Sequence, residues 1–209
     1  MGGDLLKRQY YVTALVLAVV FSLVAAAVMS GVAEPVEVAV YRALEGVMSP
    51  GMTMFMQGVT ALCDPLSVAA CCLMLLAVPK TRRTLGVPVA ASAAGAAGLN
   101  LLIKHLFLRP RPELLRLVAE TGYSFPSSHS VTSAAVAAVL ALAALRRGRS
   151  PGLAALWAAY PLLVGISRVY LGVHHAGDVL AGWLLGPIIG MAVTAAWELV
   201  QERRKPDRV

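Results

Sequence analysis

Charged residues are scarce in this sequence: Asp, Glu, Lys and Arg make up 14% of its 209 residues, whereas ordinary soluble domains contain about 25%. Hydrophobic residues make up 58%, and the mean hydropathy is +0.74. These values argue against a soluble globular protein. They predict an all-α, polytopic membrane protein that forms a single domain over residues 1–209.

Acidic residues and cysteines are also few. The 11 Asp and Glu residues form no cluster that would hold magnesium or zinc. Cys63, Cys71 and Cys72 show no CxxC spacing and offer neither a disulfide framework nor a metal site. We therefore predict that the protein uses no metal and no other cofactor.

The net charge of +7 can indicate nucleic-acid binding, so the positions of the basic residues matter. Most of them lie in short runs at the ends of hydrophobic segments, without interleaved aromatic residues. This arrangement is typical of membrane-orientation signals. We predict no nucleic-acid partner.

Six hydrophobic runs are long enough, or nearly so, to cross a membrane, and they predict a six-helix bundle. They cover residues 10–33, 64–78, 85–103, 131–145, 152–166 and 179–200. The first run has a basic start and alanines at 25–27, as a signal peptide would. It exceeds the roughly 7–15 residues of a signal core, so we expect an uncleaved helix.

Local patterns add detail to this bundle. Asp64 precedes Pro65 and is expected to cap the second helix. In the third helix, Ala91, Gly95 and Gly98 are expected to permit close packing with a neighbour.

Residues 34–47 have a different pattern, with Val36, Val40, Leu44 and Val47 on one helical face and Glu37, Tyr41 and Glu45 on another. The pattern predicts an amphipathic helix at the membrane interface. Such a helix could guide a lipid, although covering the edge of the bundle is the simpler role.

If six helices alternate across the membrane, 12 of the 18 basic residues fall on one side. By the positive-inside rule that side, with both termini, is cytoplasmic. The other six face outward, and orientation does not explain them: Arg42, Lys104, Arg109, Arg111, Arg116 and Arg168.

Two outward loops hold most of the unusual polar residues. The first contains Lys104, then six residues, then Arg111, and later the sequence Pro-Ser-Ser-His ending at His129. The second contains Ser167 and Arg168, followed by His174 and Asp178. Two outward loops can bring these groups together.

Lysine and arginine side chains converging on one point require an anion, and the planar guanidinium suits a tetrahedral oxyanion. Ser127 and the N–H groups around Ser128, at a predicted helix start, would add donors. His174 and Asp178 are four residues apart, so the carboxylate can orient the imidazole and raise its basicity. For that stretch alone, a capped helix start with interfacial histidines is the alternative.

With His174 to attack and His129 to donate a proton, the set predicts a phosphoryl-transfer site.

The three segments resemble the signature of the type 2 phosphatidic acid phosphatase family, which the soluble vanadium haloperoxidases share. The family pattern is Lys, six residues, Arg-Pro; Pro-Ser-Gly-His; and Ser-Arg, five residues, His, three residues, Asp. The resemblance implies that His174 is a nucleophile forming a phosphohistidine, Asp178 its orienting partner and His129 the general acid. It implies phosphate binding by Lys104, Arg111, Ser127, Ser128 and Arg168.

Two departures from the family pattern stand out. Ser128 replaces the usual glycine, which puts a side chain beside the site, and Ala176-Gly177 replaces the commoner Pro-Ser/Thr. His175 is three residues from Asp178 and rivals His174, but the spacing from Ser167-Arg168 selects His174.

Two further polar residues near these loops have less defined roles. Arg109 is either an outer substrate contact or a solvated loop charge, and His105 is expected to be structural.

The resemblance implies a lipid phosphatase acting on the outer face of a bacterial cytoplasmic membrane. Its substrate would be a lipid phosphate such as phosphatidic acid, phosphatidylglycerophosphate or undecaprenyl diphosphate, and no obligatory protein partner is expected. A non-enzymatic lipid-phosphate binder or transporter is the alternative, and a haloperoxidase would not need six membrane spans.

Overall fold

The computed structural model describes residues 2–113, 115–148 and 151–204, and within these ranges it is helical without strands. The elements are α1 (Gly2–Met29), α2 (Glu34–Glu45), α3 (Pro50–Ala61), α4 (Pro65–Ala77), α5 (Pro79–Thr81), the π-helical turn η1 (Arg82–Gly86), α6 (Val87–Phe107), α7 (Ser128–Arg146), α8 (Pro151–Tyr170) and α9 (Ala176–Arg203). The predicted all-α class is confirmed.

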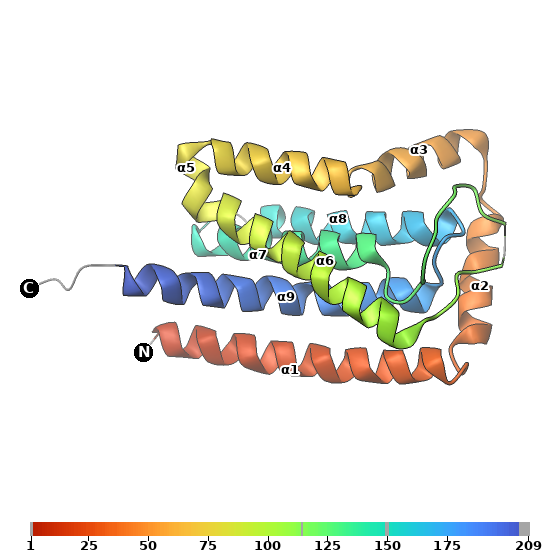
Figure 1. Ribbon diagram of the computed structural model, residues 1–209, viewed down its shortest axis with the longest axis horizontal. Helices are drawn as coiled ribbons and strands as arrows, with labels where there is room; N and C mark the ends of the chain where they lie inside the picture. Colours follow the sequence, from red (N-terminus) through yellow and green to blue (C-terminus); the bar gives the residue numbers. More distant parts are fainter. Residues whose placement is uncertain (1, 114, 149–150, 205–209) are drawn as a thin grey trace, which may run out of the picture.

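The long helices run side by side along the molecule, and α2 lies across one end of the bundle (Figure 1). Helix α1 begins and α9 ends at the opposite end. Five helices in the described ranges are long and apolar enough to span a membrane, and α3 with α4 would make a sixth, bent span. The predicted bundle of six spans agrees with this arrangement.

The second span differs from its prediction, because residues 50–61 form a helix that the hydrophobic pattern did not reveal. Helix α3 starts with Pro50 after Ser49, whose side chain accepts a hydrogen bond from the Met52 N–H. Pro65 holds the preceding Asp64 in an extended conformation, with ψ of 149°, so the chain cannot continue as one helix. Helices α3 and α4 therefore meet at a bend of 45°.

Helix α2 is amphipathic as predicted, but Glu37 and Tyr41 of its polar face pack against the protein. Glu37 and Tyr41 are buried, whereas Val36 and Val40 are 65% and 37% exposed. The Tyr41 hydroxyl donates a hydrogen bond to the Leu115 carbonyl, 2.9 Å away. Helix α2 thus binds the bundle end through polar groups and turns its valines outward.

The closest helix packing lies between α7 and α9, not on α6 as expected. Ala91, Gly95 and Gly98 of α6 are exposed, so that prediction was wrong. On α9, a Cβ atom at Gly186 would lie 2.6 Å from the Val131 carbonyl oxygen, and one at Gly190 would lie 2.6 Å from the Ala135 carbonyl oxygen. Glycines four residues apart let the two backbones approach each other.

The loop between α6 and α7 crosses the same end of the bundle as α2 (Figure 1). Phe125 anchors it, since this side chain is fully buried and its ring lies 5.1 Å from that of Phe107 and 6.1 Å from that of Phe21. The loop is therefore fixed over the bundle end.

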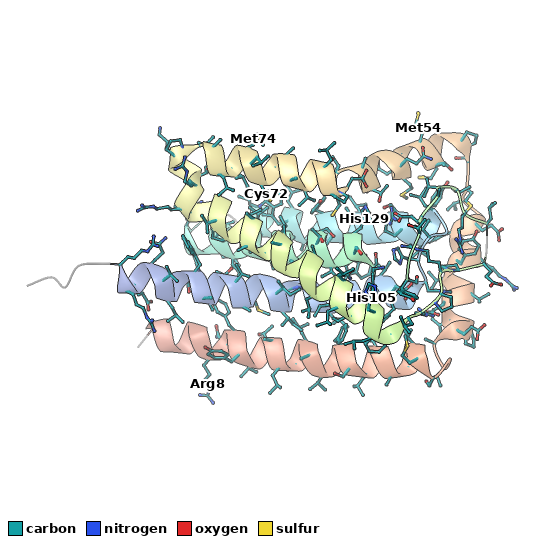
Figure 2. All side chains as sticks on the ribbon, in the orientation of Figure 1. Arg8, Met54, Cys72, Met74, His105 and His129 are labelled. Carbon is teal, nitrogen blue, oxygen red and sulfur yellow. The ribbon has the colours of Figure 1, made fainter. Side chains whose placement is uncertain are left out.

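The basic runs predicted to mark one side of the membrane lie toward the end where α1 begins and α9 ends. Figure 2 shows Arg8 near that end and His129 toward the end covered by α2. Three residues of the predicted set, Arg149, Lys205 and Arg208, lie outside the described residues.

Candidate active site

His174 lies in the short turn that joins α8 to α9. The N–H groups of Val173 and His174 both donate to the Arg168 carbonyl, at 3.2 and 3.3 Å. Gly172 has φ of +71°, and a Cβ atom there would lie 2.1 Å from the Leu115 carbonyl oxygen. The turn therefore requires glycine and brings His174 back beside the end of α8.

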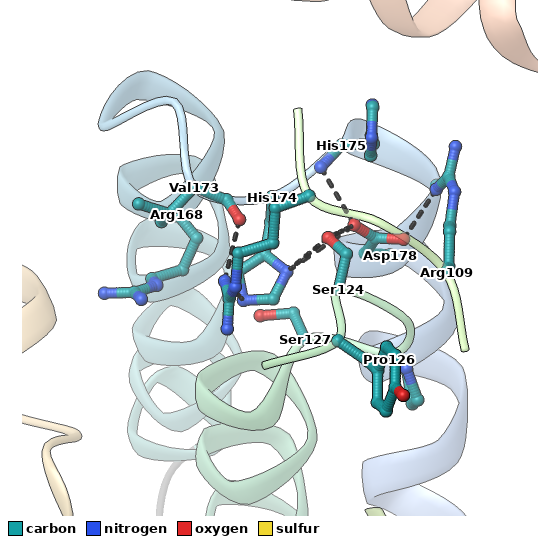
Figure 3. Close-up of polar contacts among 12 residues, drawn as sticks. Arg109, Ser124, Pro126, Ser127, Arg168, Val173, His174, His175 and Asp178 are labelled. Carbon is teal, nitrogen blue, oxygen red and sulfur yellow. Dashed lines mark hydrogen bonds and ion pairs between the residues drawn. The ribbon is translucent and has the colours of Figure 1, made fainter. Parts of the chain in front are cut away.

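The imidazole of His174 contacts both Ser124 and Asp178 through Nδ1 (Figure 3). Nδ1 lies 3.5 Å from Asp178 Oδ2 and 3.2 Å from Ser124 Oγ, and the Ser124 hydroxyl donates to the same carboxylate oxygen. The predicted His174–Asp178 pair is therefore present, with Ser124 between its two members. The sequence pattern did not single out Ser124, which lies 50 residues from His174.

The other ring nitrogen of His174, Nε2, lies 3.2 Å from Arg111 Nη1. A guanidinium only donates hydrogen bonds, so Nε2 acts as the acceptor and the ring proton is on Nδ1. The lone pair of Nε2 thus faces the cationic side of the site, which is formed by Arg111 and Arg168. This is the tautomer that a histidine nucleophile needs.

Burial keeps the His174 ring neutral. The side chain is 2% exposed, and loss of solvation lowers its pKa to about 3, although Asp178 acts in the opposite direction. Nearby Arg111 and Arg168 lower the pKa further. Near neutral pH the imidazole is therefore uncharged and has a free electron pair.

Arg109 is not a solvated loop charge, one of the two roles expected for it, because it belongs to a buried ion-pair network. Its Nη1 atom lies 2.6 Å from Asp178 Oδ1, and Nη2 lies 2.6 Å from Glu37 Oε2. Glu37 also accepts from the Gly177 N–H at 3.1 Å. Burial would lower the pKa of Arg109, but Glu37 and Asp178 raise it above its ordinary value.

This network joins three distant parts of the chain at the start of α9. The polar face of α2 suggested an interfacial role for Glu37, but no local pattern linked it to Arg109, 72 residues away. The arrangement fixes the Asp178 carboxylate from the side opposite His174.

Arg111 and Arg168, which form the cationic side of the site, are each held by hydrogen bonds to neighbouring groups. Arg111 donates to the Val173 carbonyl at 2.8 Å and to the Thr121 carbonyl at 2.9 Å. Arg168 donates through Nη1 to Thr60 Oγ1 at 2.8 Å, while its buried Nε has no partner among the described groups. Both arginines also pair with Glu120, which sequence reasoning did not select.

The start of α7 supplies the Ser-Ser-His segment. Ser127 is the N-cap residue, and Figure 3 shows its hydroxyl turned toward the ring of His174. The hydroxyl of Ser128 donates to Asn100 Oδ1 at 2.7 Å. The serine that replaces the family glycine therefore directs its side chain to α6.

His129 pairs with Asp64, whose Oδ1 atom lies 3.0 Å from Nε2 of the ring. Asp64 occupies the N-cap position of α4, but its side chain makes no capping hydrogen bond. The expected capping role was therefore wrong, because the carboxylate binds an imidazole 65 residues away.

Lys104 lies in the last turn of α6 and donates to the Tyr123 carbonyl. Together with Ser128 and His129 it lines a cavity of about 520 Å³ between α4, α6 and α7. Apolar residues of α4 and α6, including Val68 and Leu101, form much of the remaining wall.

The other two histidines are separated from the cationic side of the site. The N–H of His175 donates to Asp178 Oδ2 at 2.9 Å, and its ring lies 3.9 Å from Glu37. His105 is exposed on α6 and contacts the ring of Tyr123. No group of three or more potential metal-ligating His, Cys, Asp or Glu residues occurs in the described part of the chain.

Several known proteins are similar to this chain. Phosphatidylglycerophosphatase B of Bacillus subtilis is 36% identical over 112 residues, which cover 51% of this chain and 55% of that protein. An undecaprenyl-diphosphatase of Sulfolobus acidocaldarius is 35% identical over 118 residues, which cover 54% of this chain and 55% of the relative. The chain thus matches about half the length of each of these two relatives.

The crystal structure of a transmembrane PAP2 type phosphatidylglycerolphosphate phosphatase from Bacillus subtilis superposes with a TM-score of 0.81. The sequences are 27% identical, and the match covers 94% of this chain and 99% of the other. The PAP2 superfamily profile matches residues 85–202, which contain all three sequence segments described above. The chain belongs to the PAP2 superfamily.

Proposed function

We propose that this protein is a membrane lipid phosphatase that cleaves a lipid phosphate monoester or diphosphate through a phosphohistidine on His174. The observation that carries the proposal is the buried His174 ring, whose Nε2 atom faces Arg111 while Nδ1 contacts Ser124 and Asp178. Related proteins named phosphatidylglycerophosphatase and undecaprenyl-diphosphatase support the substrate class.

In the proposed reaction, Nε2 of His174 attacks phosphorus in line with the leaving oxygen. Lys104, Arg111 and Arg168 stabilise charge on the phosphoryl oxygens, together with Ser127 and the N–H groups at the start of α7. Asp178 stabilises the positive ring as it becomes phosphorylated. Water then attacks the phosphohistidine and releases phosphate.

His129 is proposed to protonate the leaving oxygen and afterwards to activate water. Asp64 orients its ring through the contact of Oδ1 with Nε2 at 3.0 Å. A lipid alkoxide needs this proton more than a leaving phosphate does. His129→Ala should therefore impair monoester cleavage more than diphosphate cleavage, and equal losses, with phosphoenzyme formation rate-limiting, would contradict this role.

The cavity beside Lys104 and His129 supports a lipid substrate. It continues from these polar groups along apolar side chains of α4 and α6. A phosphate at the polar end would leave the acyl or prenyl chain against this apolar wall.

We also propose that the site opens on the outer face of a bacterial cytoplasmic membrane. The site lies at the α2 end of the bundle, whereas Arg8, Arg82, Arg146 and Arg203 come from the helix ends nearest the termini. The positive-inside rule then puts the termini in the cytoplasm.

The decisive test is phosphate release by purified protein from a panel of phosphatidic acid, phosphatidylglycerophosphate and undecaprenyl diphosphate. His174→Ala should abolish turnover and the acid-labile phosphoprotein while retaining phosphate binding. His175→Ala is the matched control and should form the phosphoprotein. A non-enzymatic binder would release no phosphate in either case.

Activity should also persist in EDTA, since the proposed steps use only side chains and backbone N–H groups. Loss of activity in EDTA that magnesium restores would contradict this part of the mechanism.

A further inference from the structure

Glu120 lies between the two arginines of the site, on the loop that joins α6 and α7. Its Oε1 atom accepts a hydrogen bond from Arg168 Nη2, and its Oε2 atom is 3.6 Å from Arg111 Nη2. The Glu120 side chain is 29% exposed, whereas those of Arg168 and Arg111 are 3% and 7% exposed. One carboxylate at the rim therefore bridges two buried cations.

Glu120 is held there as a carboxylate. Burial would raise its pKa, but the charge of Arg168 and its hydrogen bond, together with Arg111, lower the pKa below its ordinary value. His129 also contributes in that direction, so three basic residues act on this one carboxylate. An anion of similar size would experience the same attraction.

The Glu120 carboxylate does not occupy all the hydrogen-bond donors of the two arginines. Nε of Arg168 is buried without a partner among the described groups, so one donor remains available. A carboxylate offers two oxygens and one negative charge, whereas a phosphate group offers three oxygens and a charge of about −1.5 to −2. A phosphate can therefore replace Glu120 and use more of the donors.

We propose that Glu120 is a specificity-determining residue that competes with phosphate for Arg111 and Arg168 and thereby disfavours free inorganic phosphate. The inference rests on the proposed function, in which these arginines bind the substrate phosphate. For a lipid substrate, the contacts of its apolar chain in the cavity lined by Val68 and Leu101 offset the free-energy cost of displacing Glu120. Inorganic phosphate has no such contacts, so Glu120 promotes its release as product.

A purely structural role for Glu120 makes the opposite prediction. If the carboxylate only held the arginines in place, its removal would disorder them and weaken phosphate binding. If it competes, its removal frees both guanidinium groups and strengthens binding. The sign of the change in affinity separates the two roles.

The test measures binding of inorganic phosphate to the purified full-length protein by isothermal titration calorimetry. Glu120→Gln keeps the side-chain size and removes the charge, and we expect phosphate to bind about tenfold more tightly. Glu120→Ala should act in the same direction. Glu113→Gln is the matched control, because Glu113 is exposed on the same loop, and should change the affinity by less than about twofold.

Inhibition of lipid hydrolysis by phosphate gives a second readout, and its inhibition constant should fall by a similar factor in Glu120→Gln. An unchanged or weaker affinity in both Glu120 variants would overturn the inference.

Arg111→Gln distinguishes this failure from failure of the proposed function. Lost phosphate binding in Arg111→Gln, with no gain in the Glu120 variants, would refute only the role of Glu120. Unaltered phosphate binding in both Arg111→Gln and Arg168→Gln would refute the anion site itself and the inference with it.

Discussion

At the scale of single residues, Arg109 connects Asp178 to the rest of the protein. It contacts Asp178 and Glu37 but not His174, and therefore acts through the carboxylate as a positioning residue. Without it, Asp178 would keep its bonds from Ser124 and from the His175 N–H but lose its charged partner. The orientation of His174 would then be less well defined.

We expect Arg109→Gln to lower kcat by about 10- to 100-fold, by analogy with residues that hold metal ligands in place, and to leave KM nearly unchanged. Rapid-quench measurement of phosphoenzyme formation should show the loss in this step. Arg116→Gln on the same loop is the control, since Arg116 is exposed and donates to the Pro112 carbonyl. A rise in KM with constant kcat would instead indicate a direct substrate contact.

The charge state of His174 gives a second prediction. A histidine with a folded-state pKa of about 3 and an unfolded-state pKa of about 6.5 takes up its proton preferentially in the unfolded state. Its contribution to stability is therefore complete above about pH 6.5 and falls as the pH decreases toward 3. The ring should stay neutral from pH 7 to about pH 4.

Histidine-labelled protein in detergent can be followed by ¹⁵N NMR, with His174→Asn to assign the signal. A titration midpoint near pH 6.5 for this signal would show that burial does not lower the pKa of the His174 ring. The acid limb of the pH–rate profile should accordingly come from another group, such as His129 or the substrate phosphate.

At the scale of elements, the contact between α7 and α9 holds the two motif-bearing helix starts together. Ser127, the N-cap residue of α7, donates its N–H to the Asp178 carbonyl in the first turn of α9, at 3.1 Å. Farther along, Gly186 meets the Ala134 side chain and the Val131 carbonyl. The spacing of these helices is therefore set by the absence of side chains on α9.

Gly186→Ala should lower the stability by about 1–3 kcal/mol, the usual cost of overpacking a tight contact. A Cβ atom there would lie 2.5 Å from that of Ala134. Gly98→Ala is the matched control: nothing lies within 4 Å of its added Cβ, and better helix propensity should raise stability by up to about 1 kcal/mol. Thermal unfolding in detergent measures both, and equal shifts would contradict the packing described.

The elements also show why the sequence revealed some features and not others. Spans and the His174–Asp178 pair follow from periodicity and short spacing, which are local properties. The partners of Arg109, His129 and Arg168 lie 48 to 108 residues away and depend on helix packing. A single Glu or Asp carries no local sequence signal of such a partner, so Glu37, Asp64 and Glu120 were not predicted in these roles.

At the scale of the whole molecule, orientation in the membrane can be tested with cysteines introduced at opposite ends. Glu113 and Arg147 are both exposed, one on the loop over the site and the other after α7. In a variant with Cys63, Cys71 and Cys72 replaced by alanine, Glu113→Cys should react with a membrane-impermeant maleimide in intact cells. Arg147→Cys should react only after permeabilisation, and the reverse pattern would invert the proposed topology.

The outward-facing valines of α2 have a consequence for how the protein senses its surroundings. The same short helix presents Val36 and Val40 outward and Glu37 to Arg109. A change in lipid packing or bilayer thickness that shifts this helix would also move Glu37, and with it the Arg109 side chain that binds Asp178. We therefore expect turnover of even a short-chain, water-soluble substrate to change when the protein is moved between bilayers of different thickness.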